Sequence, residues 1–471
     1  MTLARKKTIT AANLGGARVL VVGAARSGIA LARFLTGQGA QVTLTDLRPA
    51  QELGPQIPGL QEMGVRLELG GHDAASFLGA DLVAVSPGVP LASAPLAAAR
   101  TKGVRVVAEV EVASWFLKGK ILGVTGSNGK STTTALTGHI LEQAGLSAVA
   151  CGNLGTPLTE MIPSDAPERF YVVELSSFQL EGIESFHPSI AALLNLSPDH
   201  QDRYPDMPAY YAAKARLFMN QEPGDDAILN HDDPEVRAAA GALRARIHWF
   251  SRTGRLDAAA LVDAGAFVDA GDIVFLSEGL ETRVMPVGDL PLFGVHNQEN
   301  VMAALLMAAR CGVSPATAAQ AVASFRGLPH RLEKVGEVNG VTWFNDSKAT
   351  NVGATARSVQ SFAGNVVLIL GGKDKGGAFA ELEPLIRARV AHLVLMGQAR
   401  DDIAKQLGPI APTTLVRTLP EAVDAAARVA TPGAVVLLAP ACASFDQYSG
   451  FEARGDHFRW LVNDLTRAEQ G

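Results

Sequence analysis

The feature that most constrains the fold is a series of short apolar runs, each followed by a glycine or a polar turn. Residues 17–23 read ARVLVVG and residues 121–125 read ILGVT, and a helix-like segment follows each run. Continuous apolar runs of this length are typical of parallel strands that are covered on both faces. Their alternation with helical segments predicts doubly wound α/β domains and not a β-sandwich.

The apolar runs form three blocks along the 471 residues, and a prior of about 150 residues per domain also gives three domains. The expected strands lie at 17–23, 41–46, 80–86 and 104–107, then at 121–125, 170–174 and 190–195, and finally at 341–345, 366–370, 392–396 and 434–438. Residues 225–290 are less regular, with several short strand candidates, and Ala-rich helices are expected near 297–311 and 315–325. We therefore predict domains at 1–109, 110–328 and 329–471.

Charge and cysteine content exclude several classes of protein. The chain has 41 basic and 47 acidic residues and no long basic block, which argues against a nucleic-acid partner. No apolar stretch reaches 18 residues and the first residues lack a signal core, so we expect no membrane partner and a cytoplasmic protein. Three widely spaced cysteines predict neither a disulfide framework nor a thiolate metal site.

The segment ILGVTGSNGKSTTT at 121–134 has the form of a phosphate-binding loop, because a strand leads through glycines into a helix. Lys130 would neutralise the β- and γ-phosphates, and Ser131 would hold Mg²⁺. The strict Walker pattern needs glycine where Val124 stands, so this loop is a variant. A plain strand-to-helix turn is the alternative. The candidate ATP-binding residues are Gly126, Ser127, Asn128, Gly129, Lys130, Ser131 and Thr132.

Two later segments carry candidate metal ligands. Glu174 ends an apolar strand, where a carboxylate beside a phosphate loop can hold or orient Mg²⁺. The segment 195–202 follows the next strand and contains His200, a candidate ligand for a second metal. By their residue types alone, Glu174 could be a surface glutamate, His200 a solvated loop residue and Lys214 an exposed helix lysine.

The first block contains a nucleotide-type turn with an altered glycine pattern. Residues 23–28 read GAARSG, and Ala25 stands where a dinucleotide fingerprint needs glycine. Asp46 ends the second strand, where an acidic residue usually meets a ribose. A nicotinamide cofactor, and with it an NAD-dependent oxidoreductase, is therefore disfavoured. A UDP-linked ligand fits as well, and a domain without a ligand is the alternative.

Polar segments follow the strands of the third block, at 345–351, 371–377 and 440–446, and another marks its beginning at 328–333. The carboxyl ends of parallel strands are where open α/β sheets bind ligands. Basic and hydroxyl side chains at these ends suit a substrate that carries carboxylates.

The segments ELSSFQL, NLSPDHQDRY, HRLE, NDSKATN and PACASFDQ together resemble the Mur ligase family, and the resemblance covers essentially the whole chain. It implies a Rossmann-like first domain, a central P-loop ATPase-like domain and a Rossmann-like third domain. It also implies an ATP-dependent enzyme that adds D-glutamate to UDP-N-acetylmuramoyl-L-alanine for peptidoglycan synthesis. Another Mur ligase or a folylpolyglutamate-type ligase is the nearest alternative, and a non-catalytic nucleotide-binding protein is the alternative from another class.

The resemblance also assigns residues to ligands. The implied UDP-substrate residues are Ser27, Asp46, Arg48, Ser86, Gly88 and Asn153, and the further ATP residues are Asn300, Arg331 and Asp346. The implied amino-acid residues are Lys348, Thr350, Lys375, Ser444 and Phe445, with Lys375 favoured over Lys373. The implied Mg²⁺ ligands, at two sites, are Ser131, Glu174, His200 and a carbamylated Lys214; of these Glu174, His200 and Lys214, with Lys130, form the catalytic set. We expect a monomer.

Overall fold

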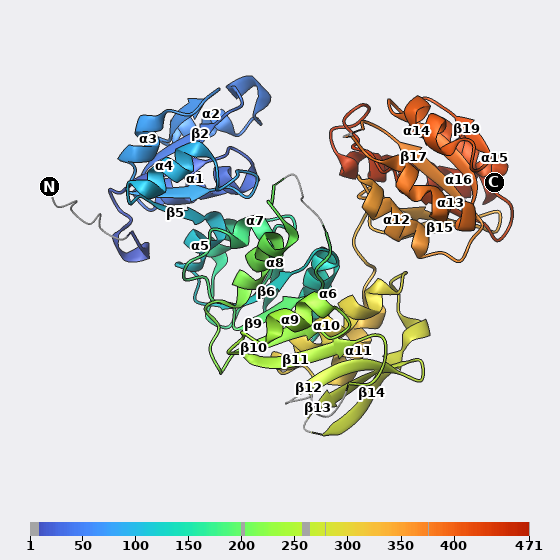
Figure 1. Cartoon of the computed structure of the whole chain (residues 1–471), viewed down its shortest axis with the longest axis horizontal. Helices are drawn as coiled ribbons and strands as arrows, with labels where there is room; N and C mark the ends of the chain where they lie inside the picture. The colour runs from blue at the N-terminus through green and yellow to red at the C-terminus, as the bar shows by residue number, and fades with distance from the viewer. Residues whose placement is uncertain (1–8, 199–202, 257–263, 278, 375, 471) are drawn as a thin grey trace. The chain divides into compact units, whose positions relative to one another are not determined.

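The computed structural model describes residues 9–198, 203–256, 264–277, 279–374 and 376–470. The chain divides into two compact units, of which the first comprises Met1–Leu290 with Gln298–Phe325 and the second Pro291–Asn297 with Arg326–Gly471. The first unit holds two sheets and the second unit holds one, as the colours of Figure 1 allow the reader to follow. None of the described helices is both long enough and apolar enough to span a membrane.

The first sheet is parallel throughout and has the strand order β3-β2-β1-β4-β5. Its strands are β1 Arg18–Val22, β2 Gln41–Asp46, β3 Arg66–Leu69, β4 Leu82–Val85 and β5 Arg105–Ala108. Its helices are α1 Arg26–Gly37, α2 Ile57–Glu62, α3 Ala74–Gly79, α4 Ala94–Thr101 and α5 Glu109–Ser114. Alternate residues of β1 enter two different cores, Val19 and Val21 one of them and Leu20 and Val22 the other. Both faces of β1 are therefore buried, which explains its continuous apolar run.

The second sheet has nine strands in the order β14-β13-β12-β11-β10-β9-β6-β8-β7. The strands are β6 Lys120–Thr125, β7 Ala148–Gly152, β8 Phe170–Glu174, β9 Ile190–Leu193, β10 Asp226–Asn230, β11 Arg246–Ser251, β12 Ala264–Asp269, β13 Asp272–Ser277 and β14 Leu280–Pro286. The associated helices are α6 Lys130–Gln143, α7 Ser177–Leu180, α8 Met207–Ala215, α9 Pro234–Ala240, α10 His296–Arg310 and α11 Pro315–Ser324. The pairing is parallel from β7 to β12 and antiparallel from β12 to β14. The antiparallel extension accounts for the less regular pattern of residues 225–290.

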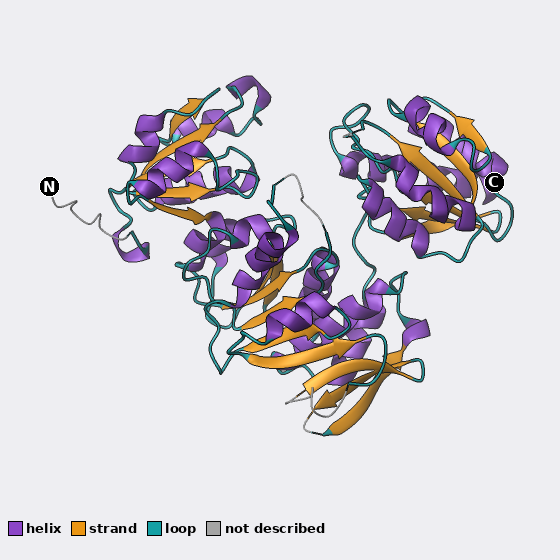
Figure 2. Cartoon of the chain, viewed as in Figure 1, coloured by secondary structure: helices purple, strands orange, loops and turns teal. Residues whose placement is uncertain are grey.

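The third sheet has the order β15-β16-β20-β17-β18-β19 and is parallel except at the β15–β16 pair. Its strands are β15 Glu333–Val338, β16 Val341–Asn345, β17 Val366–Gly371, β18 Val390–Met396, β19 Thr413–Leu415 and β20 Val435–Leu438. Its helices are α12 Val352–Gln360, α13 Glu383–Arg389, α14 Arg400–Leu407, α15 Leu419–Val429 and α16 Phe451–Gln470. Figure 2 shows helices on both faces of this sheet, as predicted for a doubly wound domain.

Every strand that the apolar runs predicted is present, within about two residues at each end. For residues 225–290, where β10 to β14 lie, the pattern gave short strand candidates without bounds, and it missed the short or partly exposed strands β3, β7, β15 and β19. These strands lack the long buried run that identifies a central parallel strand.

Candidate active site

The turn from β6 to α6 depends on two glycines with positive φ. Gly126 has φ of 149° and Gly129 has φ of 83°, a region that residues with a side chain rarely enter. A Cβ on Gly129 would lie 2.1 Å from Oδ1 of Asn300. Gly129 also caps α6, so the helix N-terminus, where backbone N–H groups can bind an anion, follows the glycine directly. The predicted phosphate-loop geometry is therefore present.

Two lysines meet at this loop. Lys130 Nζ donates to the carbonyl oxygens of Gly126 at 2.8 Å and Ser127 at 2.9 Å. Lys214 Nζ also donates to Gly126 O at 2.8 Å, from a side chain that is 2% exposed and lies over the Tyr210 ring. The expectation of a plain exposed helix lysine is therefore wrong for Lys214. Two ammonium groups on one carbonyl oxygen create a strongly electropositive position at the loop, which suits phosphate.

Glu174 ends β8, whose neighbours in the sheet are β6 and β7. Its side chain is buried, and its Oε1 accepts from Asn153 Nδ2 at 2.7 Å. Its Oε2 is also buried and has no hydrogen-bond partner among the described residues. A buried carboxylate oxygen without a donor is what a divalent cation would satisfy. With Ser131 buried at the first turn of α6, these donors fit Mg²⁺.

The segment after β9 braces the phosphate loop. The Asn195 side chain accepts from Asn128 N at 2.8 Å and donates to Asn128 O at 3.1 Å. Ser127 Oγ donates to Ser197 O at 2.9 Å and lies 3.3 Å from Tyr210 Oη. Sequence reasoning assigned no role to Asn195 or Tyr210. The position of Asn195 directly after an apolar strand could have identified it as a site residue, whereas no sequence feature distinguishes Tyr210. His200 lies outside the described residues, so its assignment stays a prediction.

Asn300 of α10 reaches the start of α6. It is buried, and its Oδ1 accepts from Thr133 Oγ1 at 3.3 Å. Thr132 is half-buried in the same first turn of α6. The structure thus brings Asn300, Lys214 and the loop residues together, which is the arrangement expected of a nucleotide site.

The turn of the first sheet, after β1, also closes tightly. A Cβ on Gly28 would lie 1.9 Å from Gly23 O and 2.6 Å from Ser86 Oγ, so this position needs glycine. Ser86 Oγ donates to Gly23 O at 2.9 Å, which fixes the end of β4 beside the turn. Ser27 is half-buried at the start of α1, and Gly88 is exposed two residues after Ser86.

Asp46 supplies an anion to the same turn. Its carboxylate accepts from Ala24 N at 2.7 Å and from the backbone and guanidinium of Arg48. Burial alone would raise the pKa of Asp46, but the hydrogen bonds from Arg48 and Ala24 lower it to about 2. Of the six implied UDP-substrate residues, Ser27, Asp46, Arg48 and Ser86 surround one turn. Asn153 instead lies after β7, where it contacts Glu174.

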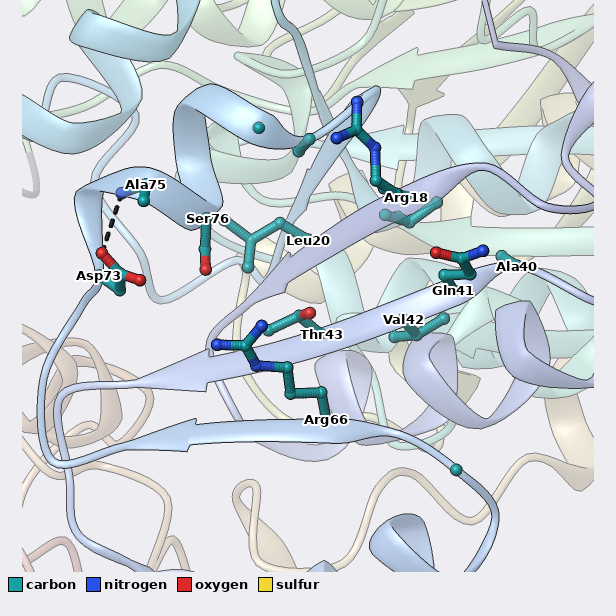
Figure 3. Close-up of a pocket in the computed structure, with 14 residues that line it drawn as sticks. Arg18, Leu20, Ala40, Gln41, Val42, Thr43, Arg66, Asp73, Ala75 and Ser76 are labelled. Atoms are coloured by element: carbon teal, nitrogen blue, oxygen red, sulfur yellow. Dashed lines mark hydrogen bonds between the residues drawn. The ribbon is translucent and has the colours of Figure 1, made fainter.

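The first sheet also carries a pocket of about 570 Å³ between its strands and α3. Figure 3 shows Arg18, Gln41 and Arg66 around it, which are the first residues of β1, β2 and β3. Asp46 and Ser86 lie at the opposite ends of the strands. None of the implied site residues lines this pocket, so it is separate from the turn after β1.

In the second unit, Arg331 lies between two residues with positive φ, His330 at 63° and Leu332 at 43°. Asp346 follows β16 and is buried; it is near Arg331, and Ser358 Oγ donates to its carboxylate. Burial raises the pKa of Asp346 to about 6, although Ser358 and Arg331 oppose this shift. Strained backbone around Arg331 is a common feature of functional sites.

The four implied amino-acid residues that the structure describes occupy two loops of the second unit. Lys348 Nζ lies 3.8 Å from the centre of the Phe451 ring, and Thr350 is half-buried two residues later. In the second loop, Ser444 is buried and Phe445 is 64% exposed. Lys375, the favoured lysine, lies outside the described residues. Lys373 forms an antiparallel bridge with Ala443, which joins its loop to that of Ser444.

Three models of protein families match the chain in succession. Residues 17–108 match the MurD-like N-terminal domain of Mur ligases, residues 124–308 the Mur ligase middle domain, and residues 330–442 the glutamate ligase domain of Mur ligases. Together these ranges cover most of the chain in the order that the resemblance predicted.

Several curated proteins are similar over nearly the full length. A UDP-N-acetylmuramoylalanine–D-glutamate ligase from Anaeromyxobacter dehalogenans is 49% identical, over 98% of this chain and 100% of its own. A ligase of the same name from Geobacter sp. (strain M21) is 46% identical, over 96% of this chain and 98% of its own.

Solved structures support the fold. A UDP-N-acetylmuramate–alanine ligase from Thermotoga maritima matches with a TM-score of 0.58 and 17% identity, over 95% of this chain and 99% of its own. A pseudomurein peptide ligase type C from Methanothermus fervidus matches with a TM-score of 0.57 and 17% identity, over 96% and 100%.

Proposed function

The chain belongs to the Mur ligase family, and from this premise we propose that it adds D-glutamate to UDP-N-acetylmuramoyl-L-alanine with the consumption of ATP. The product would be an amide of peptidoglycan precursor synthesis, released with ADP and phosphate. The curated relatives with 44–49% identity carry this activity in their names, and family membership supports dependence on ATP. The use of ATP by this chain fits the expected cytoplasmic location. We also expect the protein to be a monomer.

The observation that carries the proposal is the phosphate loop with two lysines on Gly126 O and Glu174 at the end of the neighbouring strand. In the proposed first step, the terminal carboxylate of the UDP-linked substrate attacks the γ-phosphorus of ATP, which forms an acyl phosphate and releases ADP. Two anions approach each other, so positive charge fixed in the protein lowers the barrier. Lys130 and the N–H groups at the start of α6 supply that charge from the chain itself.

Ser131, Glu174, His200 and Lys214 would hold Mg²⁺ at two sites, with Lys214 carbamylated so that it becomes an anionic ligand. When bound, Mg²⁺ offsets the negative charge of the phosphates and orients them. The unpartnered Oε2 of Glu174 supports this assignment. As an unmodified ammonium, Lys214 donates to Gly126 O, and carbamylation would leave one N–H on Nζ while it replaces the positive charge by an anionic carboxylate at the loop.

In the second proposed step, the amine of D-glutamate attacks the acyl phosphate, and phosphate leaves. We assign the UDP moiety to residues 1–109, ATP to residues 110–328 with Arg331 and Asp346, and D-glutamate to residues 329–471. Lys348, Thr350, Lys375, Ser444 and Phe445 would bind the amino acid. A cation and hydroxyls suit a dicarboxylate substrate.

The test is ADP release by the purified protein with ATP, Mg²⁺, UDP-N-acetylmuramoyl-L-alanine and D-glutamate. We expect release only when both substrates are present, and a product heavier by one glutamyl residue. L-glutamate, L-alanine and diaminopimelate serve as control amino acids, and dihydropteroate tests a folylpolyglutamate-type reaction. ADP release without either substrate, or with another amino acid in preference, would overturn the proposal.

A further inference from the structure

Arg454, on α16, is a buried arginine that none of the proposed roles uses. It lies near the start of the helix, and its side chain is 1% exposed, which makes it one of the largest fully buried side chains of the chain. Burial of an arginine is costly unless its donors are satisfied. Its contacts therefore indicate what it does in the fold.

The Arg454 guanidinium binds two different loops. Nε donates to Ser347 Oγ at 2.9 Å and Nη2 donates to Ser347 O at 2.9 Å. Nη1 and Nη2 also donate to Cys442 O, at 3.3 and 3.2 Å. Ser347 immediately precedes Lys348, and Cys442 lies two residues before Ser444. One planar group thus fixes the spacing between the two loops that carry the implied amino-acid residues.

A third loop lies against the same group. A Cβ on Gly372 would approach Arg454 Nη1 to 3.2 Å, so the glycine lets this loop pass close to the guanidinium. The next residue, Lys373, exchanges backbone hydrogen bonds with Ala443 at 2.8 and 3.0 Å. All three polar loops that follow β16, β17 and β20 are thereby tied together around Arg454.

The charge of Arg454 is not neutralised by direct contact. Its four hydrogen bonds end on a hydroxyl and on carbonyl oxygens, and no carboxylate of the described residues forms an ion pair with it. Burial lowers the pKa of Arg454 to about 10, against the field of Asp446, so the group stays protonated at neutral pH. A buried cation in contact with these loops attracts anions that bind to them.

We propose that Arg454 is a positioning residue for the amino-acid substrate, which sets the spacing of the Lys348 and Ser444 loops and adds a buried positive charge that favours a dicarboxylate. This inference rests on the proposed function of those loops. Arg454 does not touch the substrate in this role, because its side chain is buried and its four hydrogen bonds go to Ser347 and Cys442. The planar fork is essential to it, since a lysine ammonium cannot reach both loops with the same geometry.

The experiment measures KM for D-glutamate, for UDP-N-acetylmuramoyl-L-alanine and for ATP in three variants. We expect KM for D-glutamate to rise about 10-fold in Arg454→Lys, which keeps the charge, and about 100-fold in Arg454→Met, which removes it. Ser347→Ala, which removes one acceptor of the fork, should raise it about threefold. KM for UDP-N-acetylmuramoyl-L-alanine should change less than about twofold, and KM for ATP should rise less than KM for D-glutamate, because Asp346, the ATP residue beside Ser347, is also held by Ser358.

Matched controls separate this role from a loss of folding. Arg467 is exposed on the same helix, and Arg467→Lys and Arg467→Met should leave all three KM values unchanged. Ser361→Ala, which removes a half-buried hydroxyl that donates to Arg357 O, is the control for Ser347→Ala. If Arg454→Met does not fold, Arg454→Lys and Ser347→Ala still show whether KM for D-glutamate rises relative to the unmodified protein.

An unchanged KM for D-glutamate in Arg454→Lys and Ser347→Ala would overturn the inference, even if kcat falls with the folded fraction. An equal rise of all three KM values would overturn it too. If the unmodified protein shows no D-glutamate-dependent release of ADP, the proposed function itself has failed, and this outcome is distinct from either result.

Discussion

The turn after β1 and the turn after β6 both lead a buried parallel strand into a helix of the first unit, yet they carry opposite charges. In the first turn, the Asp46 carboxylate accepts from Ala24 N beside the start of α1. In the second, Lys130 and Lys214 donate to the carbonyl of Gly126 beside the start of α6. A helix N-terminus favours an anion. In the first turn this anion is the Asp46 carboxylate, whereas in the second turn a phosphate of the nucleotide would take this position.

The largest expected effect is on kcat, and it comes from replacing the first residue of each helix, Lys130 in α6 and Arg26 in α1. Lys130→Met should lower kcat about 10³-fold, because it removes a fixed positive charge from the attack on phosphorus. Arg26→Met, in a turn that holds no reacting group, should lower it less than about tenfold. Steady-state release of ADP measures both. Equal losses in the two variants would show that the turns do not differ in this way.

The next effect concerns the glycine at which each turn closes. Gly28→Ala should lower the free energy of unfolding by about 3 kcal/mol, because the new methyl group would overlap the backbone oxygen of Gly23. Gly129→Ala meets the movable Asn300 side chain but keeps φ of 83°, so about 1–2 kcal/mol is expected, with a rise in KM for ATP. Urea unfolding at pH 7 measures the first quantity.

The control for these two variants is Gly59→Ala, in α2, where a Cβ would meet nothing within 4 Å. It should be neutral or stabilising by about 0.5 kcal/mol, because alanine favours a helix. The assignment of close packing would be wrong if Gly28→Ala unfolded at the same urea concentration as Gly59→Ala.

A smaller effect comes from the anion of the first turn. The pKa of Asp46 is about 2 in the folded protein, below the ordinary value of about 3.9, so its charge stabilises the fold above about pH 4. Asp46→Asn should therefore cost about 1–2 kcal/mol at pH 7, and about half of this difference should be lost at pH 3, before it vanishes below about pH 2. Urea unfolding of both proteins between pH 7 and pH 3 gives the difference. A cost that does not depend on pH would contradict the charged hydrogen bonds.

The smallest expected effect is the difference, about 1 kcal/mol, between variants of the two side chains that hold these turns from a neighbouring strand. Ser86 makes one hydrogen bond to the first turn, whereas Asn195 makes two to the phosphate loop. Ser86→Ala should cost about 1 kcal/mol and Asn195→Ala about 2 kcal/mol in unfolding free energy. Only Asn195→Ala should also raise KM for ATP. A larger KM effect from Ser86→Ala would reverse the assignment of ATP to the second turn.

Central strands were predictable from the sequence, because a strand buried on both faces must be apolar along its whole length. β1 and β17 are examples, since alternate residues of each enter two separate cores. Strands with an exposed face were not predictable in the same way. β14 carries exposed residues along most of its length, and its pairing with β13 gives no comparable signal in one sequence.

The candidate site divides along similar lines. Glycines and Lys130 were recognisable because a phosphate loop imposes a fixed local spacing. Tyr210 and Arg454 were not, since each acts on loops that are distant in the sequence, and a tyrosine or arginine in a helix has no special spacing. Resemblance to a family identified Lys214, whose residue type alone predicts an exposed side chain.

The carbonyl of Gly126 also bears on how nucleotide affinity arises. Lys130 is held by two backbone oxygens of the loop itself, so its four-carbon chain has lost most of its rotamer freedom in the fold. A free lysine gives up as much as about 2 kcal/mol of rotamer entropy when it becomes ordered. Because Lys130 becomes ordered when the protein folds, the entropy cost of ordering it is not part of the free energy of nucleotide binding. The loop is thus preorganised: its recognition of phosphate should have a small entropic penalty at this side chain and a correspondingly slow dissociation.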